Sequence, residues 1–273
     1  MKEGTYDYRK MKRSSLIYTG YAGCILAIVA VLVAAVSAFG SGWDWWSFRT
    51  GFSILRYACY LEFLAVGLSV AGAISSLLLR PAQAAYLGVT TNWLAGIVSI
   101  CGILIGLTLV AVPWSHYRLA QLVPSIHDIT TDTAHPPQFV SIIPLRKNAP
   151  NSYLYGGPHV AALQRAAYPD IAPATLPLKP DQAFDRALET ARKMGWTIVD
   201  ANAQDGRIEA TDTTRWFRFK DDIIIRVRPS QDGSTTATPA SIIDVRSVSR
   251  VGKSDLDTNA RRIRNYLKAL TAR

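Results

Sequence analysis

The sequence predicts an α+β protein in which a three-helix transmembrane bundle precedes a soluble domain with a mostly antiparallel sheet of about four to five strands and two packed helices. Two observations support this prediction. Residues 1–114 contain three long apolar stretches but only eight of the 30 Lys/Arg residues and four of the 20 Asp/Glu residues. Residues 115–273 carry the remaining charges, and helical and strand periodicities alternate there. This second part is long enough to bury a core of its own.

Three apolar stretches have the length of membrane spans, and we place them at about 16–39, 54–79 and 93–112. Roughly 20 apolar residues are enough to cross the hydrocarbon core as a helix. The first stretch is longer than the apolar region of a cleavable signal peptide, so we expect it to remain in the protein. Gly102 and Gly106 have the four-residue spacing of close helix packing, within the bundle or in a homo-oligomer.

Basic residues are more frequent on one side of the predicted spans. The segment before the first span holds five of them: Lys2, Arg9, Lys10, Lys12 and Arg13. The second loop adds Arg80, whereas the first loop offers Arg49, with Arg56 at its edge. Because Lys and Arg favour the cytoplasmic side, we predict a multi-pass membrane protein oriented by these charges, and we place it in the bacterial inner membrane on the assumption of a Gram-negative bacterium. Its N-terminus is then cytoplasmic and its C-terminal domain periplasmic.

Glu62 is an ionisable residue well inside the second predicted span. A charge at that depth is expensive, so the residue serves either a function, such as proton binding, or packing as a protonated or paired group. The sequence shows no chain of charged partners around it, which favours the packing interpretation.

The polar part begins with a Pro-rich lead-in and connector at 115–179, where Phe139–Ile143 resembles a short strand. The α+β core follows at 180–273. Apolar residues at helical spacing predict its first helix at Pro180–Met194, and Gly195 can terminate that helix.

Four strands and a second helix complete the predicted core. Alternating apolar and polar residues indicate strands at Trp196–Val199, Arg207–Ala210, Ile223–Arg228 and Ile242–Ser249. The short turns between most of them, one ending at Gly206, imply antiparallel pairing. Ser254 and Asp257 have the spacing of a capping box at the start of the last helix. We expect the two helices to cover one face of the sheet.

Five segments of the polar part resemble a known bacterial family: Asp170–Pro173, Met194–Trp196, Ile208–Thr211, Arg215–Asp222 and Asp244–Leu256. The last contains the specific run Val-Arg-Ser-x-Ser-Arg-x-Gly-x-Ser-Asp. Together they resemble the family called domain of unknown function 1499, over about residues 120–270. The resemblance implies an identity for the domain and no activity, and it brings no catalytic residues.

Basic and hydroxyl side chains gather on the last two predicted strands. The candidate ligand-binding set is Arg226, Arg228, Arg246, Ser247, Ser249 and Arg250. If the two strands are neighbours, one sheet face presents several guanidinium groups, which suit carboxylate or phosphate ligands. The helix N-terminus at Ser254 would add N–H groups. The alternative is a structural network with nearby acids, namely Asp212, Asp221, Asp222, Asp244 and Asp255.

A second constellation consists of His127, Asp128, Asp132 and His135. These potential metal ligands would suit a hydrolase-like envelope enzyme, but their spacing matches no zinc motif. Pro136 and the proline after it favour an extended loop, in which the four side chains need not converge. We therefore predict no metal and no cofactor, and catalytic residues cannot be named from the sequence.

The charge balance narrows the class of partner. The net charge is +10, and basic residues of the polar part are interspersed with acids, which disfavours nucleic acid and suits anionic lipid surfaces. Cys24, Cys59 and Cys101 fall in three different spans, which leaves the polar part without disulfides. We predict that the extracytoplasmic domain binds an anionic lipid headgroup or an envelope protein, within a membrane complex or homo-oligomer. An envelope enzyme is the alternative.

Overall fold

The computed structural model describes residues 3–78, 92–230, 239–254 and 256–272, with the side chains of the first helix described from Tyr18 onward. The chain divides into two compact units, Met1–Tyr117 and Arg118–Arg273, called here the helical unit and the polar unit. Lys2, Arg80 and Asp255, on which parts of the predictions rest, lie outside the described residues, as do the side chains of the basic N-terminal segment.

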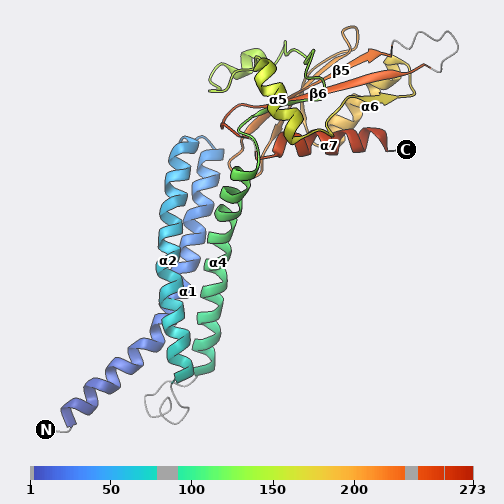
Figure 1. The fold of residues 1–273 in the computed structure, drawn as a ribbon. Helices are drawn as coiled ribbons and strands as arrows, with labels where there is room; N and C mark the ends of the chain where they lie inside the picture. The colour runs from blue at the N-terminus through green and yellow to red at the C-terminus, as the bar shows by residue number, and fades with distance from the viewer. Residues whose placement is uncertain (1–2, 79–91, 231–238, 255, 273) are drawn as a thin grey trace. The chain divides into compact units, whose positions relative to one another are not determined.

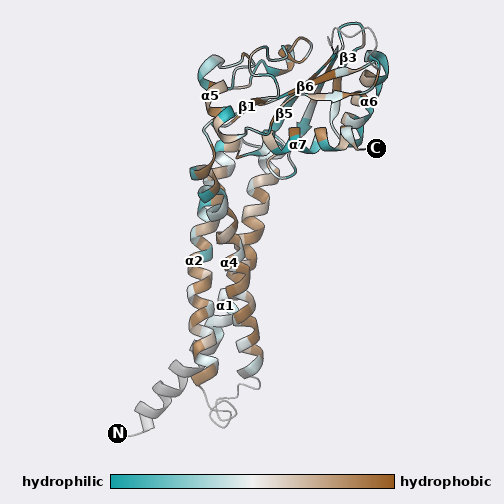
Figure 2. Cartoon of the chain, turned by 45° about the vertical axis from the view of Figure 1, so that its right-hand side comes forward, coloured by the Kyte–Doolittle hydropathy of each residue, from teal (hydrophilic) through white to brown (hydrophobic). Residues whose placement is uncertain are grey.

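The helical unit confirms the three predicted apolar helices. They are α1 (Glu3–Gly42), α2 (Phe48–Leu78) and α4 (Asn92–Leu122), and each contains a stretch long and apolar enough to cross a membrane. Figure 2 shows the apolar residues along all three. The helices extend beyond the predicted spans: α1 at both ends, α2 at its start, and α4 mainly at its end, where it continues through Pro113.

Small residues let the helices of this unit approach closely. Ala30 and Ala34 of α1 are buried, as are Ala58 and Ala65 of α2. A Cβ on Gly72 of α2 would run into the backbone of Gly20 on α1, so these two helices cross at a contact that only glycine permits.

The polar unit contains a six-stranded antiparallel sheet, as the α+β prediction requires. Its long strands are β3 (Thr197–Asn202), β4 (Arg207–Thr213), β5 (Lys220–Pro229) and β6 (Ser241–Ser249). The order is β1-β6-β5-β4-β3, where β1 (Asp128–Thr130) pairs with one end of β6, and β2 (Ala174–Leu176) with its other end. The two three-residue strands account for the difference from the predicted number.

Helices α6 (Pro180–Lys193) and α7 (Thr258–Thr271) lie on one face of this sheet, which we call the helix face (Figure 1). Apolar side chains of β4, β5 and β6, such as Ile208, Ile225 and Val245, form the core there with Phe184 of α6. Tyr266 of α7 is fully buried and donates a hydrogen bond to the carbonyl oxygen of Ala187 at 2.9 Å.

The opposite face, the loop face, is covered by a segment without strands that includes the short helix η1 (Ile143–Arg146). Phe139 and Ile142 pack there against Ile224 and Val248. The strand predicted at Phe139–Ile143 does not form. Its backbone N–H groups are taken instead by the buried carboxylate of Glu209, which accepts hydrogen bonds from Val140, Ser141 and Ile142 at 2.8–3.2 Å.

The Pro-rich connector contributes more structure than the sequence predicted, because it supplies β1, β2 and helix α5 (Gly157–Ala167). Gln164 of α5 donates to the carbonyl oxygen of Thr130 in β1 and accepts from the N–H of Thr130. Its amide therefore takes the place of a neighbouring strand along β1, which explains how so short a strand is held.

The predicted capping box at the last helix was wrong. Helix α7 begins at Thr258, after Leu256 and Asp257 adopt left-handed φ angles of 51° and 66°. The hydroxyl of Ser254 instead accepts the N–H of Leu256 and donates to the carbonyl oxygen of Pro124. Ser254 therefore fixes a turn and adds no helix N-terminus to a ligand site.

Candidate functional site

The predicted arginines do lie on one face, because β5 and β6 are neighbours in the sheet. Arg226, Arg228, Arg246 and Arg250 all belong to the loop face, but carboxylates already occupy them. Arg246 is 0% exposed, and its Nε and Nη2 donate to the two carboxylate oxygens of Asp128 at 2.9 and 2.8 Å. Two backbone carbonyls take further N–H groups, so four of the five N–H donors of Arg246 are bound within the domain.

The other three arginines share two buried aspartates. Arg250 and Arg146 both bind Asp222, at 2.8 and 2.5 Å. Arg226 and Arg228 converge on one carboxylate oxygen of Asp244, and Arg226 also reaches Asp132. Asp222 and Asp244 are thus the partners that the structural alternative named.

Ser247 and Ser249 face away from these arginines, because side chains alternate along a strand. On the helix face, Ser247 donates to Asn259 at 2.7 Å and Ser249 accepts from the same side chain at 3.0 Å. Arg262 of α7 completes this group and binds Asp212 and Asp221 at 2.8 and 2.6 Å. The predicted set is therefore divided between two faces of the sheet.

The histidine and aspartate constellation does not assemble either. Asp128 is held by Arg246. Asp132 accepts the backbone N–H groups of Ala134 and His135 and binds Arg226. Burial acts to raise the pKa of Asp132, but these three donors outweigh it and lower the pKa. Within the described residues, no group of three or more His, Cys, Asp or Glu side chains is placed to hold a metal.

A different surface gathers unsatisfied positive charge: the loop between β4 and β5 with the first residue of β5, residues 214–220, which we call the basic-aromatic loop. Arg215, Arg218 and Lys220 are exposed, and Trp216 is 58% exposed. The rings of Phe217 and Phe219 stack with centroids 5.5 Å apart. The loop contains no acidic residue.

Hydrogen bonds and one left-handed residue fix the conformation of the basic-aromatic loop. Thr214 closes it, since its N–H donates to the carbonyl oxygen of Phe219 and its hydroxyl accepts the N–H of Phe219. Arg218 has a φ angle of 51°, a conformation that non-glycine residues rarely adopt. The exposed side chains are thus carried by a defined turn.

The acids nearest to the basic-aromatic loop are neutralised from inside the domain. Asp212 and Asp221 bind Arg262, and Asp222 binds Arg146 and Arg250. The ion pairs found between described residues include none with Arg215, Arg218 or Lys220. The buried network therefore leaves the loop with a net positive charge.

The same edge of the domain receives the chain from α4. Shortly after α4 ends at Leu122, the carbonyl oxygen of Pro124 accepts the hydroxyl of Ser254, and that of His127 accepts the N–H of Ser249. Arg250, next along the chain, donates its N–H to the carbonyl oxygen of Lys220. With neighbouring strands about 4.8 Å apart, the basic-aromatic loop begins roughly 10 Å from His127.

A family profile described as "Protein of unknown function (DUF1499)" matches residues 128–270, more than half of the chain. The chain belongs to the DUF1499 family. The matched DUF1499 region runs from β1 into α7 and contains the arginine networks and the basic-aromatic loop, whereas α1, α2 and α4 precede it. No curated protein and no solved structure gives a match to this chain.

The helical unit, outside the DUF1499 match, holds the predicted intramembrane acid. Glu62 of α2 is 0% exposed, and neither of its carboxyl oxygens has a hydrogen-bond partner among the described residues. A Cβ on Gly106 of α4 would lie 2.5 Å from Oε1 of Glu62, so the glycine provides the space for this carboxyl group.

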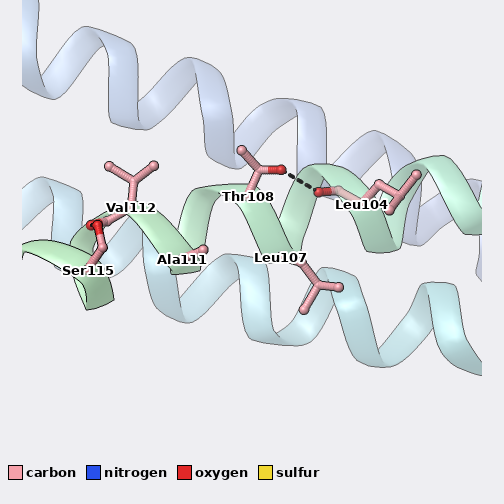
Figure 3. A pocket seen from close by; sticks show the side chains of 6 residues that line it. All are labelled: Leu104, Leu107, Thr108, Ala111, Val112 and Ser115. Carbon is pink, nitrogen blue, oxygen red and sulfur yellow. Dashed lines mark hydrogen bonds between the residues drawn. The ribbon is translucent and has the colours of Figure 1, made fainter. Parts of the chain in front are cut away.

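A hollow of about 460 Å³ along α4, also outside the DUF1499 match, has no such polar centre. Figure 3 shows its lining. The hydroxyl of Thr108 is turned back to donate to the carbonyl oxygen of Leu104 at 2.8 Å, and Ser115 similarly bonds Val112. Its surface is therefore apolar, as expected of a helix side that faces acyl chains.

The basic-aromatic loop was not predicted as a site from the sequence, although its residues carry part of the family resemblance. The available signal was local: three basic and three aromatic residues within Arg215–Lys220, without an acid. The arginines on the neighbouring strands were the more regular pattern. Their buried partners cannot be identified from sequence spacing, so these arginines looked available to a ligand.

Proposed function

We propose that this protein holds its DUF1499 domain against the anionic surface of the membrane that its own apolar helices cross. The observation that carries the proposal is the basic-aromatic loop, in which exposed Trp216 stands between Arg215 and Arg218. Indole rings favour the headgroup level of a bilayer. Each Lys or Arg near an anionic surface contributes roughly 1 kcal/mol.

The connection to α4 supports this assignment. Only Val123 separates Leu122 from Pro124, whose carbonyl oxygen accepts a hydrogen bond from Ser254 at the edge where the basic-aromatic loop emerges. The chain therefore passes from the last residue of α4 into this edge through one residue, about 3.6 Å of extended chain. The tether makes the encounter of loop and lipid intramolecular, so weak contacts suffice.

We further propose that the membrane is a bacterial inner membrane, with the N-terminus in the cytoplasm and the DUF1499 domain on the periplasmic side. The distribution of Lys and Arg around the apolar helices supports this orientation. The lipid we assign is anionic, with a phosphate headgroup. A protein partner in an envelope complex, or a second copy of the chain, is the competing occupant of the loop.

The enzyme alternative has weaker support. His127, Asp128, Asp132 and His135 would have to act together, but both aspartates are bound to arginines of the sheet. An arginine that holds a carboxylate in this way competes with any metal for the same oxygens.

Hydrogen exchange of the full-length protein in nanodiscs tests the lipid proposal. We expect residues 214–220 to be better protected in discs that contain anionic lipid than in neutral discs. Changing Arg215, Arg218 and Lys220 to Gln should remove this difference, because it withdraws about 3 kcal/mol, or about two orders of magnitude in the docking equilibrium.

The matched control changes three exposed basic residues elsewhere in the domain, Arg192, Lys193 and Lys268, to Gln. This control removes the same charge and should leave the protection of the basic-aromatic loop unchanged. Equal loss in both variants, or no lipid dependence in the wild type, would contradict the proposal. Photocrosslinking from position 216 separates the occupants: a lipid adduct supports docking to lipid, and a protein adduct favours the competing partner.

A further inference from the structure

Glu62 occupies a space that the helical unit provides for it. The side chain is fully buried between helices, and a Cβ on Gly106 would meet both Oε1 of Glu62 and Val66. Neither carboxyl oxygen finds a donor among the described residues. A buried polar group without a partner is rare and requires an explanation, such as a bound proton or water.

Glu62 is one of the buried polar side chains of α1, α2 and α4, and we call the set Ser37, Glu62, Ser69 and Ser99 the polar seam. Ser69 and Ser99 also stand opposite glycines, because a Cβ on Gly102 would meet Ser69 and one on Gly20 would meet Ser99. The hydroxyl oxygens of Ser37 and Ser69 likewise lack partners among the described residues. Ser69 lies two helical turns from Glu62, about 10 Å along α2.

Among the described residues, the groups around Glu62 supply no opposite charge. Helix α1 buries alanines, including Ala30 and Ala34, and α4 presents Gly106. On α2 itself, the titratable neighbour is the Cys59 thiol, which is neutral when protonated, and Arg56 is exposed. An ionised carboxylate would therefore be buried without a counter-ion, whereas the protonated acid carries no charge to compensate.

We propose that Glu62 is a reversible proton-binding site within the membrane-spanning helices, reached by water along the polar seam. Its ligand is the proton. On binding, an O–H bond forms at one carboxyl oxygen and the charge changes from −1 to 0; on release, the proton passes to water. The hydroxyl of Ser99 donates to the carbonyl oxygen of Ala95 at 2.7 Å and can still accept a hydrogen bond. The unpartnered hydroxyls of Ser37 and Ser69 can each donate and accept, so the seam can support water between Glu62 and a membrane face. This site goes beyond lipid docking and does not depend on it.

Infrared spectroscopy of the full-length protein in lipid bilayers tests the proposal directly, because a protonated carboxyl group has a C=O band that the carboxylate lacks. Spectra are taken from about pH 4 to about pH 10, across the ordinary range of titrating side chains. The wild-type minus Glu62→Gln difference should contain one carboxyl band whose intensity falls as the pH rises. A band that stays constant, or no band, would overturn the proposal.

Two glycine variants keep the test decisive if Glu62→Gln does not fold. Gly106→Ala places a methyl group against Oε1 and should shift the frequency of the Glu62 band, whereas Gly67→Ala, which meets no atom within 4 Å, should not. Ser69→Ala should leave the band in place but slow its shift on transfer to D₂O, because it removes a hydroxyl from the seam. Unchanged exchange in Ser69→Ala would overturn the water route.

Discussion

At the scale of single residues, the buried arginines of the sheet act as internal counter-ions. Arg262, Arg146 and Arg250 neutralise the acids at the ends of β4 and β5, and Arg246 neutralises Asp128. Because each of these carboxylates is bound from inside, the cations of the neighbouring basic-aromatic loop remain available to an external anion. The network therefore neutralises the acids inside the domain and leaves the cations of the loop unpaired with them, in addition to holding the elements of the domain together.

The sequence indicated which residues carry these charges but could not pair them all. Strand alternation predicts that Arg226 and Arg228 share one face. The sequence also allowed a structural network in which Asp222 and Asp244 bind arginines. The partner of Arg246 was not predictable. Asp128 is 118 positions away, on a three-residue strand whose place in the sheet is set by β6.

Arg246 should contribute far more to stability than Arg228. Arg246→Ala leaves Asp128 buried without a cation, which costs about 3–5 kcal/mol in the free energy of unfolding. Arg228 is 41% exposed and shares Asp244 with Arg226, so Arg228→Ala should cost at most about 1 kcal/mol. Thermal unfolding of the full-length variants compares them, and similar small losses would show that the buried pair contributes little.

At the scale of secondary structure, the strands with clear alternation were predictable and the short elements were not. In the second half of strand β5, Ile225 and Val227 lie on the helix face and alternate with Arg226 and Arg228 on the loop face, and this pattern is visible in the sequence. Strands β1 and β2 have three residues each, too few to show a period. They form because each pairs with one half of β6, along the edge of β6 that does not face β5.

The loop face illustrates why long-range contacts override local patterns. Val140, Ser141 and Ile142 have the composition of a strand, yet their N–H groups bind Glu209 of β4. One buried carboxylate accepts three donors, so the segment turns where it would otherwise extend. Such a contact joins residues almost 70 positions apart and cannot be predicted from the local sequence.

Two glycines with left-handed backbones give a matched test of the turns between elements. Gly195 follows α6 with φ 78° and meets no atom within 4 Å; Gly206 precedes β4 with φ 61° and faces the carbonyl oxygen of Val227. Gly195→Ala should cost about 1–2 kcal/mol from the left-handed conformation alone. Gly206→Ala should cost more, because its Cβ also collides with backbone. Chemical unfolding measures the difference, and equal costs would contradict this reading of the turn.

At the scale of the whole molecule, the division into two units is the feature that the sequence predicts best. Apolar composition and charge density change together near the end of the third span, and both are sums over many residues. Single errors, such as the missed α5, do not affect them. The helical unit packs through glycine and alanine, whereas the polar unit has an aliphatic and aromatic core built from β4, β5, β6, α6 and α7.

Because the polar unit contains this core, we expect residues 118–273 to fold without the apolar helices. A chain of about 150 residues buries roughly two thirds of its surface on folding, which is enough for an independent domain. The fragment should unfold cooperatively, and Arg246→Ala should lower its melting temperature on the order of 10 °C, by the same amount as the corresponding transition of the full-length chain. Gly72→Ala, which disturbs the contact of α2 with Gly20, should leave that transition of the full-length chain unchanged. A fragment that aggregates or melts without cooperativity would show that the DUF1499 domain requires the helices for its stability as well as for its attachment.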